Sequence, residues 1–270
     1  MSTSAASSTP TDATTLRLEV VRRGATSVVQ ALRSHPPLAL RPLPPSGATA
    51  RVAIVQSAAC LVEGDDVRVS VTVGPGAALE VVELSATLAH PVAERAVRLR
   101  TDIEINAGGR LVWCEQPLIV AARTDLVRDV HLTLVGDARA LHGEALLLGR
   151  DGEEPGRARS RLRVTRDGTP VLDETLALGA RTAWASPAVL GSARSVTGVT
   201  LLGVPPGSVA LPPDAFVLAG GDVALRRLAL ARRVESVDLA RVRAAWTAAV
   251  LGVEDRRHPE PLRPRPRETS

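Results

Sequence analysis

Between residues 64 and 84 the sequence alternates between apolar and polar residues with a period of two, and this pattern constrains the fold more than any other. Residues 67–73 carry valine at every second position, which places four β-branched side chains on one face of a strand. A Gly-Pro-Gly sequence at residues 74–76 then turns the chain, because proline presets one backbone angle and glycine accepts a positive one. A second apolar run begins at Leu79, so the stretch predicts a β-hairpin.

The same unit of strand, turn and strand recurs along the chain. Glycine-containing turns begin at residues 74, 106, 136 and 166, so successive turns are 32, 30 and 30 residues apart. Such a spacing is typical of stacked units that complete their hydrophobic core only against their neighbours. An ordinary β-sandwich with regular loop lengths would give the same pattern. The sequence therefore predicts a mainly β protein of stacked β-hairpins, with a β-helix-like or sandwich-like body of two layers and a small C-terminal helix.

Composition favours a single β domain over residues 16–252. A chain of 270 residues can bury a sizeable core without disulfides or metal. Residues 1–15 and 253–270 offer too little apolar surface to order themselves, and we expect both to be disordered tails. Residues 35–47 are rich in proline, which fits an edge strand or a connection but not a central strand.

Several classes of function are disfavoured by composition. The chain has no lysine, which excludes Schiff-base chemistry and a phosphate-binding P-loop. A net charge of only +4 and four aromatic residues in all offer little to nucleic acid, whose bases stack on aromatic side chains. No apolar run approaches the ~18 residues of a spanning helix, and the N-terminus lacks the features of a signal peptide. We therefore expect a cytoplasmic protein that binds neither membrane nor nucleic acid.

One helix is predicted, over residues 236–251. Ser236 can cap its first turn, and Gly252 is placed to end it. Apolar residues at spacings of three and four form one face, which includes Trp246. This tryptophan would fasten the helix to the sheet or dock a partner.

Few residues suggest catalysis. His142 and Glu144 lie two apart in a predicted strand and share a face, with His131 in the preceding strand. A tight metal site needs three or four ligands, and a hydrolase needs a third convergent residue, so ordinary hydrogen-bonded or solvent-facing side chains are the favoured interpretation. We therefore predict that the protein is not an enzyme.

Four arginines alternate along a later predicted strand, at positions 157, 159, 161 and 163. The simplest interpretation is a solvated face or an edge kept charged against aggregation. The alternative is a docking surface, which would make the protein a β-repeat binding module for an acidic protein or a glycan.

Short motifs in a consistent order resemble the urease accessory protein family UreD, also called UreH, over roughly residues 16–252. The segment Ala58-Ala59-Cys60 and the segment Leu88-Ala89-His90 depart from the family pattern, so the chain resembles a divergent member. The matching motifs are Leu61-Val62-Glu63-Gly64-Asp65, Ser85-Ala86-Thr87, Cys114-Glu115-Gln116-Pro117-Leu118-Ile119, Glu144 to Gly149-Arg150, and Arg166-Asp167-Gly168.

This resemblance implies a maturation factor without catalytic activity. Proteins of the family bind urease apoprotein on one side and UreF on the other, and through UreF the UreG GTPase that delivers nickel. The resemblance implies a passage through the β layers for nickel in transit, with no tightly bound cofactor. It makes Asp65, Glu115 and Glu144 candidates to line that passage, with Arg150 positioning one of them by a bidentate ion pair, and it marks Thr87 as part of a family motif.

Overall fold

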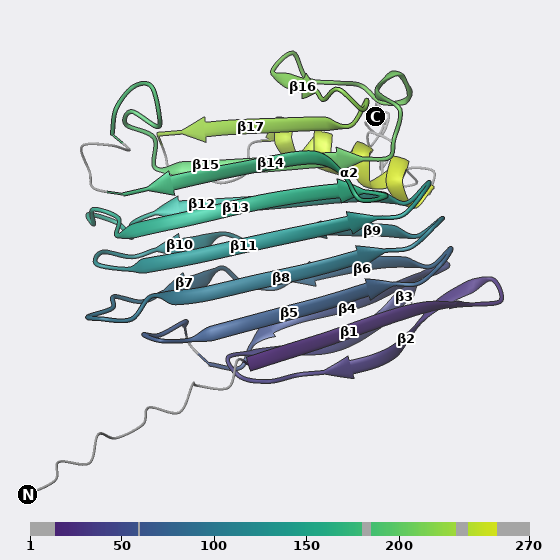
Figure 1. The fold of residues 1–270 in the computed structure, drawn as a ribbon, viewed down its shortest axis with the longest axis horizontal. Helices are drawn as coiled ribbons and strands as arrows, with labels where there is room; N and C mark the ends of the chain where they lie inside the picture. The colour runs from purple at the N-terminus through teal and green to yellow at the C-terminus, as the bar shows by residue number, and fades with distance from the viewer. Residues whose placement is uncertain (1–13, 59, 180–184, 231–236, 253–270) are drawn as a thin grey trace, which may run out of the picture.

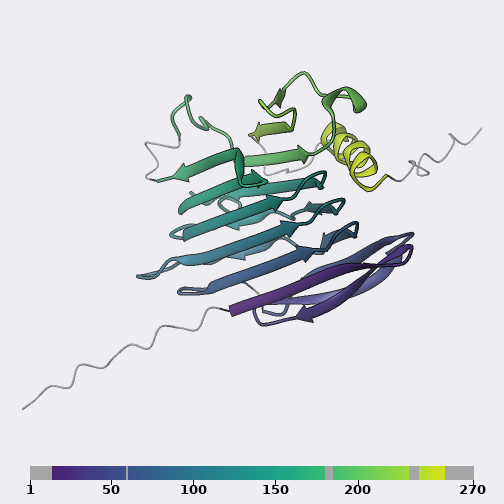
Figure 2. The same ribbon diagram turned by 45° about the vertical axis from the view of Figure 1, so that its right-hand side comes forward.

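In the part of the chain that the structure describes, two β-sheets are stacked face to face and one α-helix lies on the outside (Figure 1). The computed structural model describes residues 14–58, 60–179, 185–230 and 237–252. Strands follow one another up the stack, from β1 and β2 at one end to β14 and β17 at the other (Figure 2). The predicted β-helix-like body of two layers with a C-terminal helix is confirmed, while the predicted tails lie largely outside the described residues.

The first sheet has seven strands, in the order β14 (Thr169–Leu178), β13 (Arg157–Arg166), β11 (Asp125–Leu134), β8 (Val97–Ile105), β5 (Asp66–Val73), β1 (Thr14–Arg23) and β2 (Thr26–Arg33). The second has ten, with the main order β16 (Ala215–Val217), β17 (Val223–Ala229), β15 (Ser195–Leu202), β12 (Arg139–Leu148), β9 (Arg110–Cys114), β6 (Ala78–Glu83), β4 (Thr49–Gln56) and β3 (Leu38–Ser46). Two short strands, β10 (Leu118–Val120) and β7 (Thr87–Ala89), complete it beside β12. A 3₁₀ turn, η1, covers Pro206–Ser208, and the helix α2 covers Val237–Leu251.

The repeating unit differs from the predicted hairpin. Strand β5 belongs to the first sheet and β6 to the second, so the Gly-Pro-Gly turn carries the chain from one sheet to the other. The same holds for β8 and β9 and for β11 and β12. Each strand pairs in parallel with a strand one repeat away, as where Val69 lies opposite Thr101 and Asp125 opposite Arg157. The period of about 30 residues is therefore the distance between hydrogen-bonded partners.

The number of residues in a connection distinguishes the crossing turns, which lead from one sheet to the other, from the turn that closes a hairpin. The three crossing turns span residues 74–77, 106–109 and 135–138, four residues each. The turn between β13 and β14 has only residues 167–168 and closes a true antiparallel hairpin. A two-residue loop holds its strands at ladder distance, whereas four residues reach across to the facing sheet. The hairpin prediction was therefore correct for the fourth unit and wrong for the first three.

The crossing turns are stacked on one another by hydrogen bonds. The Gly108 N–H donates to a carboxylate oxygen of Asp137 in the next turn, at 2.6 Å, and the Gly136 N–H donates to Asp167 at 2.9 Å. Between the sheets, the four valines of β5 are each at most 3% exposed. The alternation seen in the sequence thus fills a shared core with one face of each strand.

The prolines and the helix occupy the positions expected of them. Strand β3, which holds three of the five prolines of residues 35–47, lies at the edge of the second sheet. Helix α2 packs on the outer face of this sheet through Leu239, Trp246 and Val250, all at most 2% exposed. Gly252 follows the helix with φ +69°, a left-handed conformation that suits glycine. The predicted Ser236 cap lies outside the described residues.

Among the residues described, no helix has the length and apolar character needed to span a membrane.

Trp246 is predicted to hold α2 on the sheet. Its side chain is fully buried, and its indole N–H donates to the Ala210 carbonyl at 3.3 Å. Replacing Trp246 with alanine should lower the free energy of unfolding by about 3–5 kcal/mol, because a large cavity replaces the ring. Urea denaturation followed by circular dichroism measures this. Phe216→Ala is the control, since this ring is 61% exposed and its loss should change stability by no more than about 0.5 kcal/mol. Equal effects of the two substitutions would contradict the assignment.

Candidate functional site

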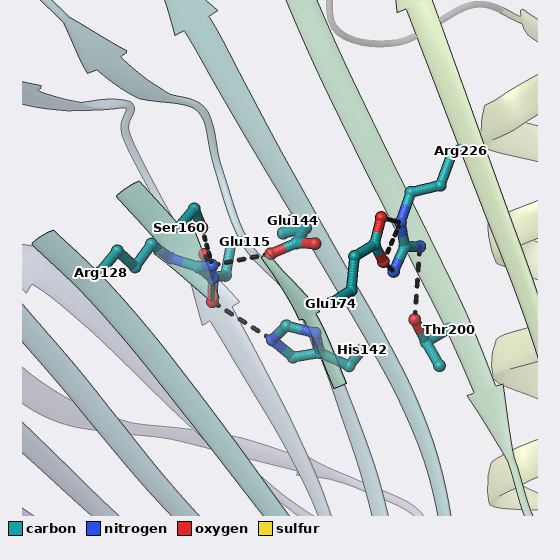
Figure 3. A network of polar contacts seen from close by, with 8 residues as sticks. All are labelled: Glu115, Arg128, His142, Glu144, Ser160, Glu174, Thr200 and Arg226. Atoms are coloured by element: carbon teal, nitrogen blue, oxygen red, sulfur yellow. Dashed lines mark hydrogen bonds and ion pairs between the residues drawn. The ribbon is translucent and has the colours of Figure 1, made fainter. Parts of the chain in front are cut away.

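A charged cluster lies between the two sheets, where the alternation would otherwise place apolar side chains (Figure 3). Arg128 projects from β11 of the first sheet, and Ser160 from the adjacent β13. Glu115, directly after β9, and His142 and Glu144 of β12 face them from the second sheet. Five side chains from distant parts of the sequence thus meet in the interior.

Arg128 is the centre of this cluster. One of its terminal nitrogens donates to both oxygens of Glu115 at 2.6 Å. The other donates to Glu144 at 2.7 Å and to the Ser160 hydroxyl at 3.0 Å. His142 Nε2 lies 3.3 Å from a Glu115 oxygen, while its buried Nδ1 has no hydrogen-bond partner. The guanidinium therefore joins the two sheets by charge-assisted hydrogen bonds.

The Arg128 charge keeps Glu115 ionised. Burial alone would raise the pKa of Glu115, but the guanidinium and the hydrogen bond from His142 outweigh burial and lower the pKa to about 2. Among the residues described, no three His, Cys, Asp or Glu side chains form a group that could hold a metal ion. The guanidinium occupies the space toward which the Glu115 and Glu144 carboxylates converge.

A second carboxylate, Glu83, lies beside Glu115 and behaves in the opposite way. It accepts hydrogen bonds from the Trp113 indole at 2.9 Å and from the Gln116 N–H at 2.8 Å. Burial and repulsion from Glu115 nevertheless raise the pKa of Glu83 to about 7. Two neighbouring carboxyl groups therefore differ in protonation near neutral pH.

The second sheet is interrupted beside these carboxylates. Strand β9 ends at Cys114 and β10 begins at Leu118, and both pair in parallel with β12. The intervening residues 115–117 include Pro117, which cannot donate a ladder hydrogen bond. A similar gap, residues 84–86, separates β6 from β7. Glu83 is therefore the last residue of β6, and Glu115 is the first residue of a gap, where its N–H still donates to the Gly143 carbonyl at 2.8 Å.

Cavities reach the cluster from more than one side. A small one of about 40 Å³ reaches Glu83 and Glu115 and is also lined by Thr87, whose hydroxyl accepts a hydrogen bond from Gln56 at 2.9 Å. Two larger cavities, of about 210 and 320 Å³, both reach Glu144 and Gly198. A Cβ at Gly198 would lie 2.9 Å from a Glu144 oxygen, so glycine provides room for this side chain.

The larger cavity opens at the end of the stack, next to a second ion pair between the sheets. Arg226 of β17 donates to both oxygens of Glu174 on β14, at 3.1 and 2.8 Å through Nε, and lies 3.5 Å from the Thr200 hydroxyl (Figure 3). Phe216 and Leu228 line the same cavity and are more than half exposed. Polar side chains thus continue from the cluster toward the end of the stack.

The residues predicted from sequence divide into two groups. Glu115 and Glu144 both belong to the cluster, and Thr87 lines the small cavity on its flank. Asp65 lies in the turn before β5, where its carboxylate accepts the Val62 N–H at 2.8 Å. Trp246 belongs to α2 and is buried between this helix and the second sheet. The metal-binding roles of the three carboxylates remain predictions.

Arg128, not Arg150, makes the ion pairs to the candidate carboxylates. Arg150 pairs with Glu153, three residues further along the same loop. His131 lies on the outer face of β11, because it is three residues from the inward-facing Arg128. Sequence reasoning missed Arg128, although β11 alternates strictly and places Arg128 among its buried positions.

The row of four arginines is a ladder of exposed ion pairs. Arg157 pairs with Asp125 at 2.7 Å, Arg159 with Asp129 at 3.3 Å, and Arg161 with Asp173 at 2.7 Å. Arg163 lies 3.7 Å from Asp173. The arginines share one face as predicted, but β13 is not an edge strand and the neighbouring aspartates offset their charge. This arrangement favours a solvated sheet face over a docking surface for an acidic partner.

The fold and the cluster define a class: a solenoid-like protein of two stacked sheets that encloses a layer of carboxylates and arginine. Comparison with known proteins gives the family. A family model described as "UreD urease accessory protein" matches residues 12–260. The chain belongs to this family, as its motifs had predicted.

Two relatives from Streptomyces agree with this assignment. The chain is 42% identical over 194 residues to "Urease accessory protein UreD 1" of Streptomyces griseus, covering 71% of this chain and 74% of the relative. It is 35% identical over 237 residues to "Urease accessory protein UreD" of Streptomyces coelicolor, covering 86% and 92% of the two chains. Both relatives are named accessory proteins.

The raised pKa of Glu83 predicts a pH-dependent stability. The folded protein binds this proton more tightly than the unfolded chain, whose carboxyl has the ordinary pKa of 4.5. The stabilisation is therefore fully present below pH 4.5 and is lost as pH rises through 7. Between pH 8 and pH 6 the contribution should be about 1 kcal/mol.

The comparison with Glu83→Gln isolates this contribution, because glutamine does not titrate. Urea denaturation at pH 6 and pH 8 should give wild-type protein a larger gain in stability at the lower pH than the variant shows. Identical pH dependence of the two proteins would exclude Glu83 as the titrating group.

Proposed function

We propose that this protein acts in urease maturation as a scaffold that joins urease apoprotein to UreF and, through UreF, to the UreG GTPase, and that it assists nickel insertion. Membership of the UreD family supports a role in urease maturation. The partners follow from the family resemblance, as do a cytoplasmic location and the absence of catalysis. Nickel is a cargo in this proposal and not a resident cofactor.

The observation that carries the nickel role is the pair of inward-facing carboxylates, Glu115 and Glu144. They belong to adjacent segments of the second sheet, converge on one point between the sheets and border cavities on either side. Carboxylate oxygen and imidazole nitrogen are suitable ligands for a divalent ion such as nickel, and His142 adds an imidazole next to Glu115. An ion in transit would enter from one cavity, contact these side chains and leave through another.

Retention of partners and delivery of nickel can be tested separately. In cells that co-express urease subunits, UreF and UreG, tagged wild-type protein should co-purify with urease and UreF. The double variant Glu115→Gln and Glu144→Gln, once circular dichroism shows that it is folded, should still co-purify. Both side chains lie between the sheets, and the glutamine oxygens can still accept hydrogen bonds from Arg128. The urease should nevertheless contain several-fold less nickel. Nickel content is measured by elemental analysis of purified urease.

Asp129→Asn and Asp173→Asn together provide the matched control, since these carboxylates lie on the outer face of the first sheet. This control should leave urease nickel content at the wild-type level. Absence of any complex with wild-type protein would reject the scaffold role. Normal nickel content with the Glu115 and Glu144 double variant would reject the passage.

Asp65 needs its own test, because it lies in a turn and not in the cluster. Asp65→Ala removes the acceptor of the Val62 N–H and should lower the free energy of unfolding by about 1 kcal/mol. We expect this variant to support normal urease activation once it is folded, as measured by urease activity in co-expressing cells. A folded variant that fails to activate urease would instead assign Asp65 to the nickel route.

A further inference from the structure

Arg128 is an arginine in a row of apolar positions. The inward face of β11 is otherwise formed by Leu126, Val130, Leu132 and Leu134, and Arg128 is only 1% exposed. A guanidinium remains protonated at any accessible pH, so the cost of burying its charge is offset only by its partners. The structure therefore keeps a permanent cation in the middle of the core.

The partners of this cation are the two carboxylates assigned above to the nickel route. Arg128 donates directly to both oxygens of Glu115 and to one oxygen of Glu144, at distances of 2.6–2.7 Å. An incoming divalent ion and the guanidinium would compete for the same oxygen lone pairs. The single positive charge of Arg128 already balances one of the two carboxylate charges before any ion arrives.

The surrounding cavities give an ion access to both carboxylates. The cavity of about 210 Å³ borders Glu115 and Glu144 together. The cavity of about 40 Å³ reaches Glu115, and the cavity of about 320 Å³ reaches Glu144 and Ser160. Arg128 contacts Glu115, Glu144 and Ser160, so it lies among the side chains that border these cavities.

We propose that Arg128 is the positioning residue of the route: a resident cation that orients Glu115 and Glu144 and competes with the transported divalent ion, so that the ion is held weakly and released. This inference rests on the proposed function for its biological meaning, but the competition itself is a property of the isolated protein. Without the arginine, the oxygens of Glu115 and Glu144 would be free to bind nickel more tightly. With the arginine in place, the same side chains bind the nickel ion weakly and release it.

The test is a calorimetric titration of the purified full chain with Ni²⁺ alone at fixed pH. Arg128→Met keeps the approximate length of the side chain and removes the charge, so it should bind Ni²⁺ about tenfold more tightly than wild type, a change of about 1.4 kcal/mol. Arg128→Lys should give a smaller gain, because an ammonium is a point charge that cannot contact both carboxylates in the bidentate manner of arginine. A merely structural role predicts lower stability without any gain in affinity.

Two further variants identify the source of the gain. Adding Glu144→Gln to Arg128→Met should remove the increase in affinity, because one of the two released carboxylates is lost. Arg161→Met, on the outer face, also removes one positive charge and should leave Ni²⁺ affinity unchanged. A comparable gain in Arg161→Met would show that net charge is responsible and would overturn the proposal.

Circular dichroism establishes whether each variant folds. If Arg128→Met does not fold, the Arg128→Lys titration decides, and an affinity equal to or weaker than that of wild type overturns the proposal. A folded Arg128→Met with unchanged or weaker Ni²⁺ affinity overturns it directly. These outcomes do not depend on urease: failure of the Glu115 and Glu144 double variant to lower urease nickel content rejects the passage, whereas the titration reports only on competition between Arg128 and the ion.

Discussion

Hydrogen bonding between strands one repeat apart is the interaction on which the whole structure depends. Strands β5, β8, β11 and β13 form one continuous parallel ladder in the first sheet, and β4, β6, β9 and β12 form another in the second. Parallel strands bury both faces more often than antiparallel ones, and here the inner faces cover each other. Because each unit pairs only with its neighbours, side chains at the same position of successive units are brought into line along the stack.

This alignment explains how charge can exist in the core. Glu83, Glu115 and Glu144 come from three successive units of the second sheet, and Arg128 and Ser160 from two adjacent strands of the first. A single buried carboxylate would be costly, but Glu115 and Glu144 are paired with Arg128, and the raised pKa of Glu83 allows protonation to relieve its repulsion from Glu115. The polar layer is therefore a consequence of repetition, in which the same inward position carries polar residues in several consecutive units.

The sequence predicted where the strands lie far better than it predicted which strands pair with each other. Alternation with a period of two identifies which residues face the core, and the alternating valines of residues 67–73 lie in β5. It does not specify whether the next strand along the chain lies in the same sheet. The length of each turn was the available signal for that distinction. The site was found only in part: Glu115 and Glu144 came from the family resemblance, while Arg128 and Glu83 occupy inward positions of their strands and were detectable as charges out of place in the alternation.

The connections at the two ends of the strands differ in how much variation in length they can accept. At one end the crossing turns all have four residues. They are joined to each other, since the Gly76 N–H donates to the Ala107 carbonyl and the Gly108 N–H donates to Asp137, so an inserted residue would disrupt the adjacent turns as well. At the opposite end the connections 90–96, 121–124 and 149–156 already differ in length. These connections also contact each other, since the Val92 N–H donates to the Arg123 carbonyl at 3.1 Å and the Gly156 N–H to the Ala121 carbonyl at 2.9 Å. Their differences in length are accommodated by the residues between these contacts. New binding specificities would therefore arise at that end, while the other keeps the spacing of the stack constant.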